Sequence, residues 1–179
     1  MKFLLILLLI CNTASAKDFD TTPQVIKSID TPKSYKTVAY DERYTFAVPV
    51  EFGVKRVGAR HMFILSPMNK TVFGVLELPT LLQPEDYGLD ITKRELLSTF
   101  YDKNYVSNKD INTTRKEIFK SSSNIIVYKR DGFMFFREDR YLDNQTTITT
   151  SINDDVLTST FPTDKEEIIM NFIKSIKVK

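Results

Sequence analysis

The sequence contains very few of the residues that build the commonest catalytic and metal centres. Among its 179 residues there is one cysteine, Cys11, one histidine, His61, and no tryptophan. A structural zinc site needs several thiolate or imidazole ligands, so this composition excludes one. A Ser-His-acid relay would have to be assembled around His61 from scattered parts, and we interpret this residue instead as a surface or edge-strand histidine.

Glycine is also scarce, and neither sign of charge is in large excess. The five glycines never cluster into a phosphate-binding loop, which leaves nucleotide binding without support. Lys and Arg number 25 against 23 Asp and Glu, so bulk charge selects neither nucleic acid nor an acidic membrane surface as a partner. We therefore expect no cofactor, no metal and no nucleic acid.

The longest apolar run is short and follows Lys2 at the N-terminus. It covers residues 3–10, eight positions, whereas a membrane-spanning helix needs about 20. The small residues Ala14 and Ala16 follow it, which predicts a signal peptide over residues 1–16 that is cleaved after Ala16. The mature chain would then be periplasmic or secreted, with no membrane span.

Cys11 offers an alternative, because a cysteine directly after an apolar run is where bacterial lipoproteins are processed and acylated. Ile10 precedes it here, whereas lipoprotein signals favour Gly, Ala or Ser at that position. We therefore do not expect lipidation at Cys11, and ordinary cleavage would leave the mature chain free of cysteine.

The rest of the chain divides into a tether and one domain. Residues 17–34 are polar, include two prolines and show no sustained hydrophobic period, which predicts a flexible N-terminal tether. Residues 35–179 are long enough for a single domain whose core is held by packing alone.

Several segments are apolar on both faces when they are placed on strands. These are residues 61–66, 71–78, 124–129 and 133–136, and further strands are expected at 35–40, 44–50 and 146–160. A strand that is apolar on both faces belongs in a sheet covered on both sides. Asp131 and Gly132 are typical of a hairpin turn and predict antiparallel neighbours. The charged run at 137–140 predicts a strand that leaves the core for water.

Two helices have clear start signals. Thr92 and Glu95 form a capping box that opens a helix ending near Asn104. Thr163 and Glu166 form a second capping box, which is followed by the clearest apolar stripe of the chain. Together with the strands, these helices predict the α+β class.

The order of these elements resembles that of a known family. The likeness is carried by the end of the opening strand, Phe46, Ala47, Val48 and Pro49, and by the closing amphipathic helix at 161–177. In these segments the chain resembles the PsbP-like superfamily, whose bacterial branch includes DcrB-like envelope proteins. The resemblance implies an α/β/α sandwich, an antiparallel sheet covered by helices on both faces. It also implies a binding or assembly accessory, and it carries over no catalytic residues.

One connecting segment, residues 79–90, has unusual content for a loop. Leu81, Leu82 and Tyr87 are set among prolines and a glycine, where polar residues would be expected. An exposed apolar loop would be a candidate partner contact. The alternative is that Leu81 and Leu82 pack under the helix that begins at Thr92.

One basic cluster and two acidic runs are weaker candidates for functional sites. Lys55, Arg56 and Arg60 form a basic candidate surface, for which a solvated hairpin is the alternative. The acidic runs at 85–86 and 153–155 lack the spacing of a dedicated calcium loop, and we interpret them as solvated turns.

These features favour an exported, non-catalytic binding protein of the bacterial envelope. It would engage another envelope or secreted protein, as an accessory or as an inhibitor of the immunity-protein kind. Two alternatives stay open. A carboxylate-based envelope hydrolase would need two carboxylates converging in a cleft, and a small-ligand or lipid carrier would need an apolar cavity between sheet and helix.

Overall fold

The computed structural model describes residues 18–68, 72–77, 83–102, 104–105, 108–152 and 155–178. The predicted signal peptide, with Ala14 and Ala16, lies outside these residues. Within them the elements are, in order, β1 (Gln24–Val25), β2 (Tyr35–Ala39), β3 (Tyr44–Pro49), β4 (Gly53–Val57), β5 (His61–Leu65), β6 (Val72–Glu77), the 3-10 helix η1 (Pro84–Tyr87), α1 (Lys93–Tyr101), α2 (Lys109–Ser121), β7 (Ser122–Arg130), β8 (Phe133–Arg140), β9 (Gln145–Ile152), β10 (Asp155–Pro162), α3 (Glu166–Ser175) and β11 (Lys177–Val178).

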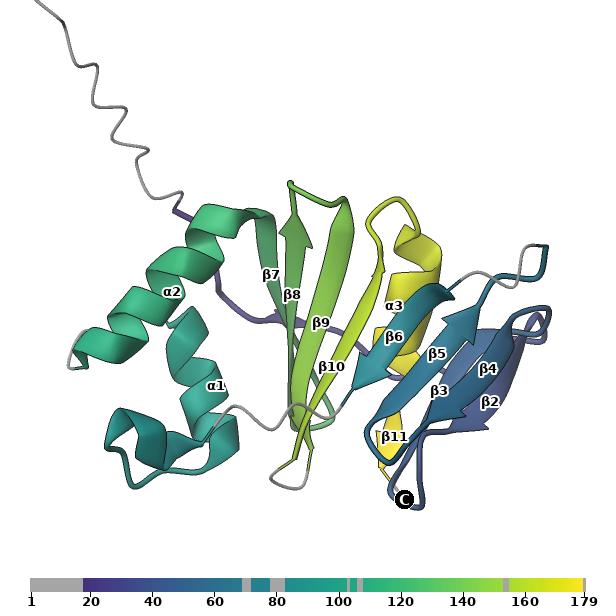
Figure 1. The fold of residues 1–179 in the computed structure, drawn as a ribbon, viewed down its shortest axis with the longest axis horizontal. Coiled ribbons are helices and arrows are strands. Elements are labelled where there is room, and N and C mark those ends of the chain that lie inside the picture. Colours follow the sequence, from purple (N-terminus) through teal and green to yellow (C-terminus); the bar gives the residue numbers. More distant parts are fainter. Residues whose placement is uncertain are drawn as a thin grey trace, which may run out of the picture.

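The strands form two sheets. The large sheet has eight strands in the order β1-β7-β8-β9-β10-β6-β5-β4, and the small one has three in the order β11-β3-β2. β1 runs parallel to β7, and the other neighbours pair antiparallel. Figure 1 shows the large sheet across the whole molecule, with the small sheet behind its β4–β5 end. We call the side of the large sheet that faces the viewer in Figure 1 its front face.

The β7–β8 hairpin forms as predicted. Asp131 and Gly132 have φ angles of 49° and 82°, the left-handed values that a two-residue hairpin turn requires. The antiparallel register places Val127 opposite Phe136, so these two side chains share the front face. Their sequence neighbours point to the back face, where the main core lies.

The main core fills the space between the back of the large sheet, the small sheet and α3. Phe172 of α3 lies between Phe46 of β3 and Phe161 of β10, with ring centroids 5.4 and 5.2 Å away. All three side chains are almost completely buried. This aromatic row joins the two sheets through the closing helix.

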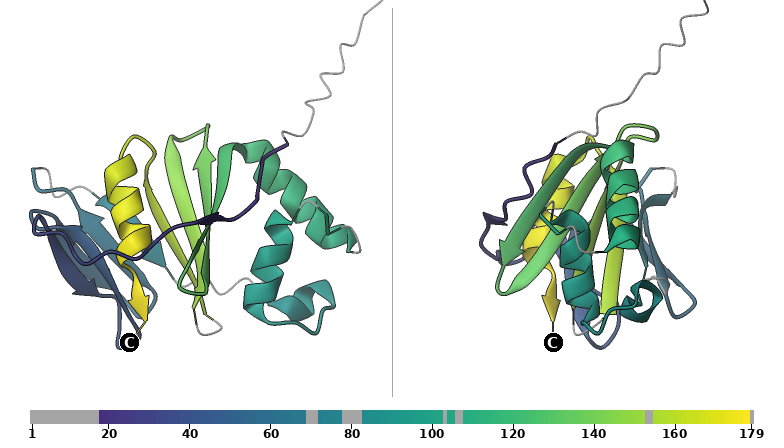
Figure 2. Two further views of the ribbon diagram at one scale, coloured as in Figure 1. Left: turned by 180° about the vertical axis from the view of Figure 1, so that it is seen from behind. Right: turned by 90° about the vertical axis from the view of Figure 1, so that its left-hand side faces the viewer.

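Helices α1 and α2 cover the front face at the β7 end (Figure 2). Leu96, Phe100 and Ile111 pack there in one cluster with Phe136. The capping box of α1 is confirmed, since Thr92 accepts from the Glu95 amide and the Glu95 side chain accepts from Thr92. Helix α2 was not predicted. Its sequence is mostly polar, and its few apolar residues make too sparse a stripe to mark a helix.

The prediction of an α/β/α sandwich is wrong. The part of the chain that the structure describes is mostly β, with 43% of its residues in strands and 24% in helices. The back face is covered by α3 together with the three-stranded sheet, and the described helices cover the front face over only part of its width. Strands that are apolar on both faces predict a covering layer, but they do not reveal whether that layer is helix or sheet.

Two local predictions are also wrong. β8 continues to Arg140 inside the sheet, and Arg137 and Asp139 are only 4% and 6% exposed because they pair with each other. Helix α3 begins at Glu166 without a side-chain cap. The hydroxyl of Thr163 lies instead 3.1 Å from that of Thr146 in β9.

The segment predicted as a tether makes specific contacts. Gln24 and Val25 pair with β7, and the amide of Ile29 donates to the Lys174 carbonyl at 3.2 Å. Phe19 meets Phe119 of α2 edge-on, with ring centroids 5.5 Å apart. In Figure 2 the purple segment can be followed along the back of the molecule. None of the helices in the described residues is both long and apolar enough to cross a bilayer.

Candidate functional site

A pocket opens at the β7 end of the molecule, between residues 20–23, helix α1 and the front face of β7 and β8. We call it the α1 pocket. Its volume of about 370 Å³ lies near the lower limit for small-molecule sites, roughly 300–1,000 Å³. The right-hand view of Figure 2 faces this end of the molecule.

The floor of the α1 pocket is apolar. Val127, Met134 and Phe136 belong to the front face of the β7–β8 hairpin, and each lines the pocket. The Phe136 ring stacks on that of Tyr101 with centroids 4.3 Å apart and an angle of 17°. Strand alternation places these side chains on one face, and the stacked tyrosine fixes the wall contributed by α1.

The rim of the α1 pocket is polar and is held by the end of helix α1. Ser98, Asp102 and Asn104 line it, and Asp102 accepts the Asn104 amide at 2.9 Å. Arg115 of α2 donates to the Asp102 carbonyl and, at 2.8 Å, to the Tyr105 carbonyl. This arginine satisfies carbonyl groups beyond the last turn of α1 and therefore fixes the rim.

Beside the pocket, the hydroxyl of Tyr101 donates to the carboxylate of Glu138 in β8. Burial raises the pKa of Tyr101 well above its usual value, and the negative charge of Glu138 raises it further. Burial likewise raises the pKa of Glu138, although the Tyr101 hydrogen bond and the charge of Arg140 oppose this. The pair is a buried acid whose ionised form is costly.

We expect Glu138→Gln to increase the free energy of unfolding at pH 7. A raised pKa means that the folded protein holds this proton more tightly than the unfolded chain, so stability falls as pH rises through the folded-state value. The amide keeps an oxygen to accept from Tyr101 but cannot ionise. Urea unfolding followed by circular dichroism should show the advantage at pH 7 and its loss below about pH 4, where a glutamate is protonated in either state. A variant that is less stable at pH 7 would contradict this account.

The hydrolase alternative requires two carboxylates that face each other. Glu138 and Asp139 do not form such a pair. The two residues are neighbours on a strand and point to opposite faces, Glu138 towards Tyr101 and Asp139 towards Arg137. Across the parts of the chain that the structure describes, no group of three or more His, Cys, Asp and Glu side chains could hold a metal ion.

Of the three residues predicted as a partner contact, the structure describes only Tyr87. Leu81 and Leu82 lie outside the described residues. Tyr87 is half-buried and packs edge-on against Phe100 of α1 at 5.4 Å, so its ring supports the helix. His61 is exposed, and its Nε2 lies 3.6 Å from a Glu77 carboxylate oxygen.

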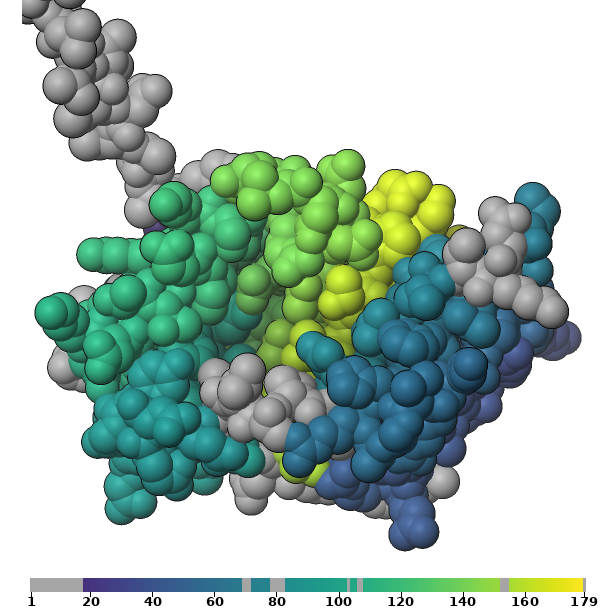
Figure 3. Space-filling model, viewed as in Figure 1, coloured from purple at the N-terminus to yellow at the C-terminus, as the bar shows by residue number. Residues whose placement is uncertain are grey.

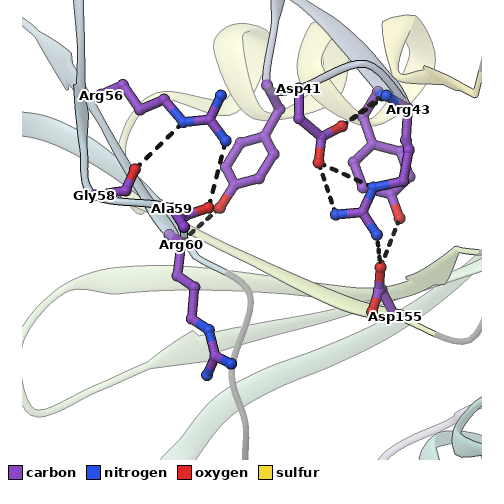
Figure 4. A network of polar contacts seen from close by, with 9 residues as sticks. Asp41, Arg43, Arg56, Gly58, Ala59, Arg60 and Asp155 are labelled. Atoms are coloured by element: carbon purple, nitrogen blue, oxygen red, sulfur yellow. Dashed lines mark hydrogen bonds and ion pairs between the residues drawn. The ribbon is translucent and has the colours of Figure 1, made fainter.

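A polar network ties the two sheets together at the start of β10 (Figure 4). Arg43 pairs with Asp41 at 2.7 Å and also with Asp155, and the Tyr44 hydroxyl lies 3.4 Å from the same Asp155 carboxylate. Burial raises the pKa of Tyr44 to about 12, so its hydroxyl stays protonated at neutral pH. The network connects the β2–β3 turn to the large sheet and has a structural role.

The basic surface predicted from the sequence lies next to this network. The guanidinium of Arg56 lies 5.7 Å from the centre of the Tyr40 ring and bonds to the Gly58 carbonyl at 3.3 Å. The Tyr40 hydroxyl donates to the carbonyl of Arg60 at 2.5 Å (Figure 4). These contacts fix the shape of the β4–β5 hairpin and leave its positive charges at the surface.

The buried charges of β8 were missed by the sequence analysis. Arg137 pairs with Asp139 at 2.8 Å and with Glu166 at 2.7 Å, while Asp139 also accepts from Thr146 at 2.7 Å. Burial alone would lower the pKa of Arg137, but Asp139 and then Glu166 raise it above its ordinary value. Opposite charges at i and i+2 in a strand that continues an apolar run were the signal that could have revealed this pair.

No protein-family model matches the chain, and the comparison with curated protein sequences found no match.

Proposed function

We propose that the chain is an exported, non-catalytic accessory protein that binds another envelope or secreted protein, and that the α1 pocket is its contact site. The observation that carries the proposal is an apolar floor, open at the surface and surrounded by a polar rim. Protein interfaces have this organisation at the places where one partner inserts a side chain into the other.

The chemistry around the pocket supports binding more than turnover. The two ionisable side chains beside the pocket, Tyr101 and Glu138, are hydrogen-bonded to each other. Each therefore already has a partner within the protein. The pocket is fixed by strands, by α1 and by Arg115, which makes it a preformed site. A preformed apolar recess suits a contact that selects the shape of an inserted side chain.

The test is to fill the pocket. Ser98→Phe adds a ring at the rim, and Thr113→Phe on the exposed face of α2 is a matched control. In both helices the original hydroxyl bonds at 3.0 Å to the carbonyl four residues earlier. The tagged protein, expressed in its own source, should retain one stoichiometric partner. We expect Ser98→Phe to weaken its retention by about tenfold or more, corresponding to 1.4 kcal/mol, and Thr113→Phe to leave it unchanged.

Retention that is equal for both variants would show that the partner binds elsewhere, and an empty capture would count against a protein partner. A second candidate function, a small-ligand carrier, is favoured by the position of the pocket between sheet and helix. Native mass spectrometry of the protein isolated from its source separates the two, because a carrier would retain a small molecule that Ser98→Phe displaces.

A further inference from the structure

The large sheet ends in an uncovered edge. β4 (Gly53–Val57) pairs with β5 on one side and has no described strand on the other. In an antiparallel pair, alternate residues direct their N–H and C=O groups to the neighbouring strand, and the remaining ones point away from it. Those outward groups of β4 are a template for one more strand. Figures 1 and 3 show this end of the sheet on the right, in blue.

The same edge carries exposed positive charge. Lys55 and Arg56 are exposed on β4, and Arg60 is exposed in the turn that follows. None of the three forms an ion pair with a carboxylate in the described residues. Asp41 and Glu42 line the same surface hollow as Arg56, and Asp41 is paired with Arg43 at 2.7 Å.

The exposed cations of β4 determine which kind of strand could pair with this edge. A second copy of the chain pairing antiparallel through β4 about Lys55 would place lysine opposite lysine, which is unfavourable. Lysine on an edge strand protects a sheet against this kind of self-association. An acidic strand would instead place carboxylates opposite the same cations. Pairing with its own copies is therefore disfavoured in this register, and the edge is better suited to a partner of opposite charge.

We propose that the β4 edge binds an extended acidic segment of another protein, which adds to the large sheet as a further strand. Lys55 shares the front face with Phe63, its cross-strand partner, whereas Arg56 points to the back over Tyr40. Acidic residues at successive positions of the segment would therefore meet a cation on each face. Backbone hydrogen bonds provide the affinity, and the charge pairs set register and direction.

The experiment uses the protein and a ten-residue peptide in which pairs of adjacent glutamates alternate with pairs of threonines, so that carboxylates lie on both faces of the added strand. We expect amide shifts in nuclear magnetic resonance spectra and slowed hydrogen exchange within Gly53–Val57. The same peptide with every backbone amide N-methylated keeps its charge but has no N–H group to donate to the ladder on either edge, so it should bind at least about tenfold more weakly. Lys55→Glu should also weaken binding at least about fivefold, whereas Lys116→Glu on α2 makes the same charge change and should have no effect.

Three outcomes would overturn the proposal: no protection within Gly53–Val57, equal binding of the N-methylated peptide, or equal binding of a short single-stranded oligonucleotide. The last two would show attraction by charge alone. This site is independent of the α1 pocket, because Ser98→Phe leaves β4 unchanged and Lys55→Glu leaves the pocket unchanged. Failure of either proposal can therefore be recognised separately.

Discussion

Replacing Phe172 by alanine is expected to lower the free energy of unfolding by about 3–5 kcal/mol. The ring is 1% exposed and lies between Phe46 and Phe161, so its removal leaves a cavity at the junction of both sheets and α3. Neighbouring strands cannot collapse into this space without losing their hydrogen-bond register. The melting temperature should fall by roughly 10 °C for a chain of this length. Urea unfolding monitored by circular dichroism measures the loss.

Phe63→Ala is the matched control for this variant. Phe63 is half-buried on the front face of β5, where its ring leaves no enclosed cavity behind when it is removed. Phe63→Ala should therefore lower the free energy of unfolding clearly less than Phe172→Ala does. Equal losses at the two positions would mean that the aromatic row does not join the sheets as described.

The second large effect is expected from Asp139→Ala. This change leaves the guanidinium of Arg137 buried, with the more exposed Glu166 as its remaining carboxylate. Breaking one side of a buried pair typically costs about 3–5 kcal/mol, because an uncompensated charge stays in the core. Asp139 also accepts from Thr146 at 2.7 Å and from Asn124 at 3.1 Å, so these donors lose their partner too.

The double variant Arg137→Met with Asp139→Leu should be more stable than Asp139→Ala alone, because both charges leave the core together. Asp143→Ala is the surface control. Asp143 pairs with Arg140, but both side chains are 40% or more exposed. Asp143→Ala should therefore change the free energy of unfolding by no more than about 1 kcal/mol. A single Asp139 variant as stable as the wild type would show that Arg137 finds water or another acceptor.

The sequence predicted those elements whose signals are local. The Thr92 capping box depends on two residues three positions apart, and the Asp131–Gly132 turn depends on two adjacent residues with left-handed backbone. Both signals are complete within a few residues and need no tertiary information. The Thr163 cap failed because the Thr163 hydroxyl lies against that of Thr146, a distant residue that no local pattern reveals.

Features that depend on pairs of distant segments were not predictable in the same way. Arg137 is buried because Asp139 and Glu166 compensate its charge, and Glu166 comes from another element. The α1 pocket requires residues 20–23, a helix and a hairpin to meet, so no single segment signals it. The three-stranded sheet could replace the expected helices because both layers present similar apolar surface to a strand.

The parallel pairing of β1 with β7 has a consequence for the order in which the protein forms during synthesis. Gln24 lies beside Tyr128, so the first strand of the chain must wait for one of the middle strands before it has a partner. Ribosomes release the N-terminal segment long before β7 emerges, and contacts between distant segments form late in folding. Residues 20–23, which precede β1, therefore close the α1 pocket only after most of the large sheet has been made. A nascent chain stalled before β7 would lack this recess altogether.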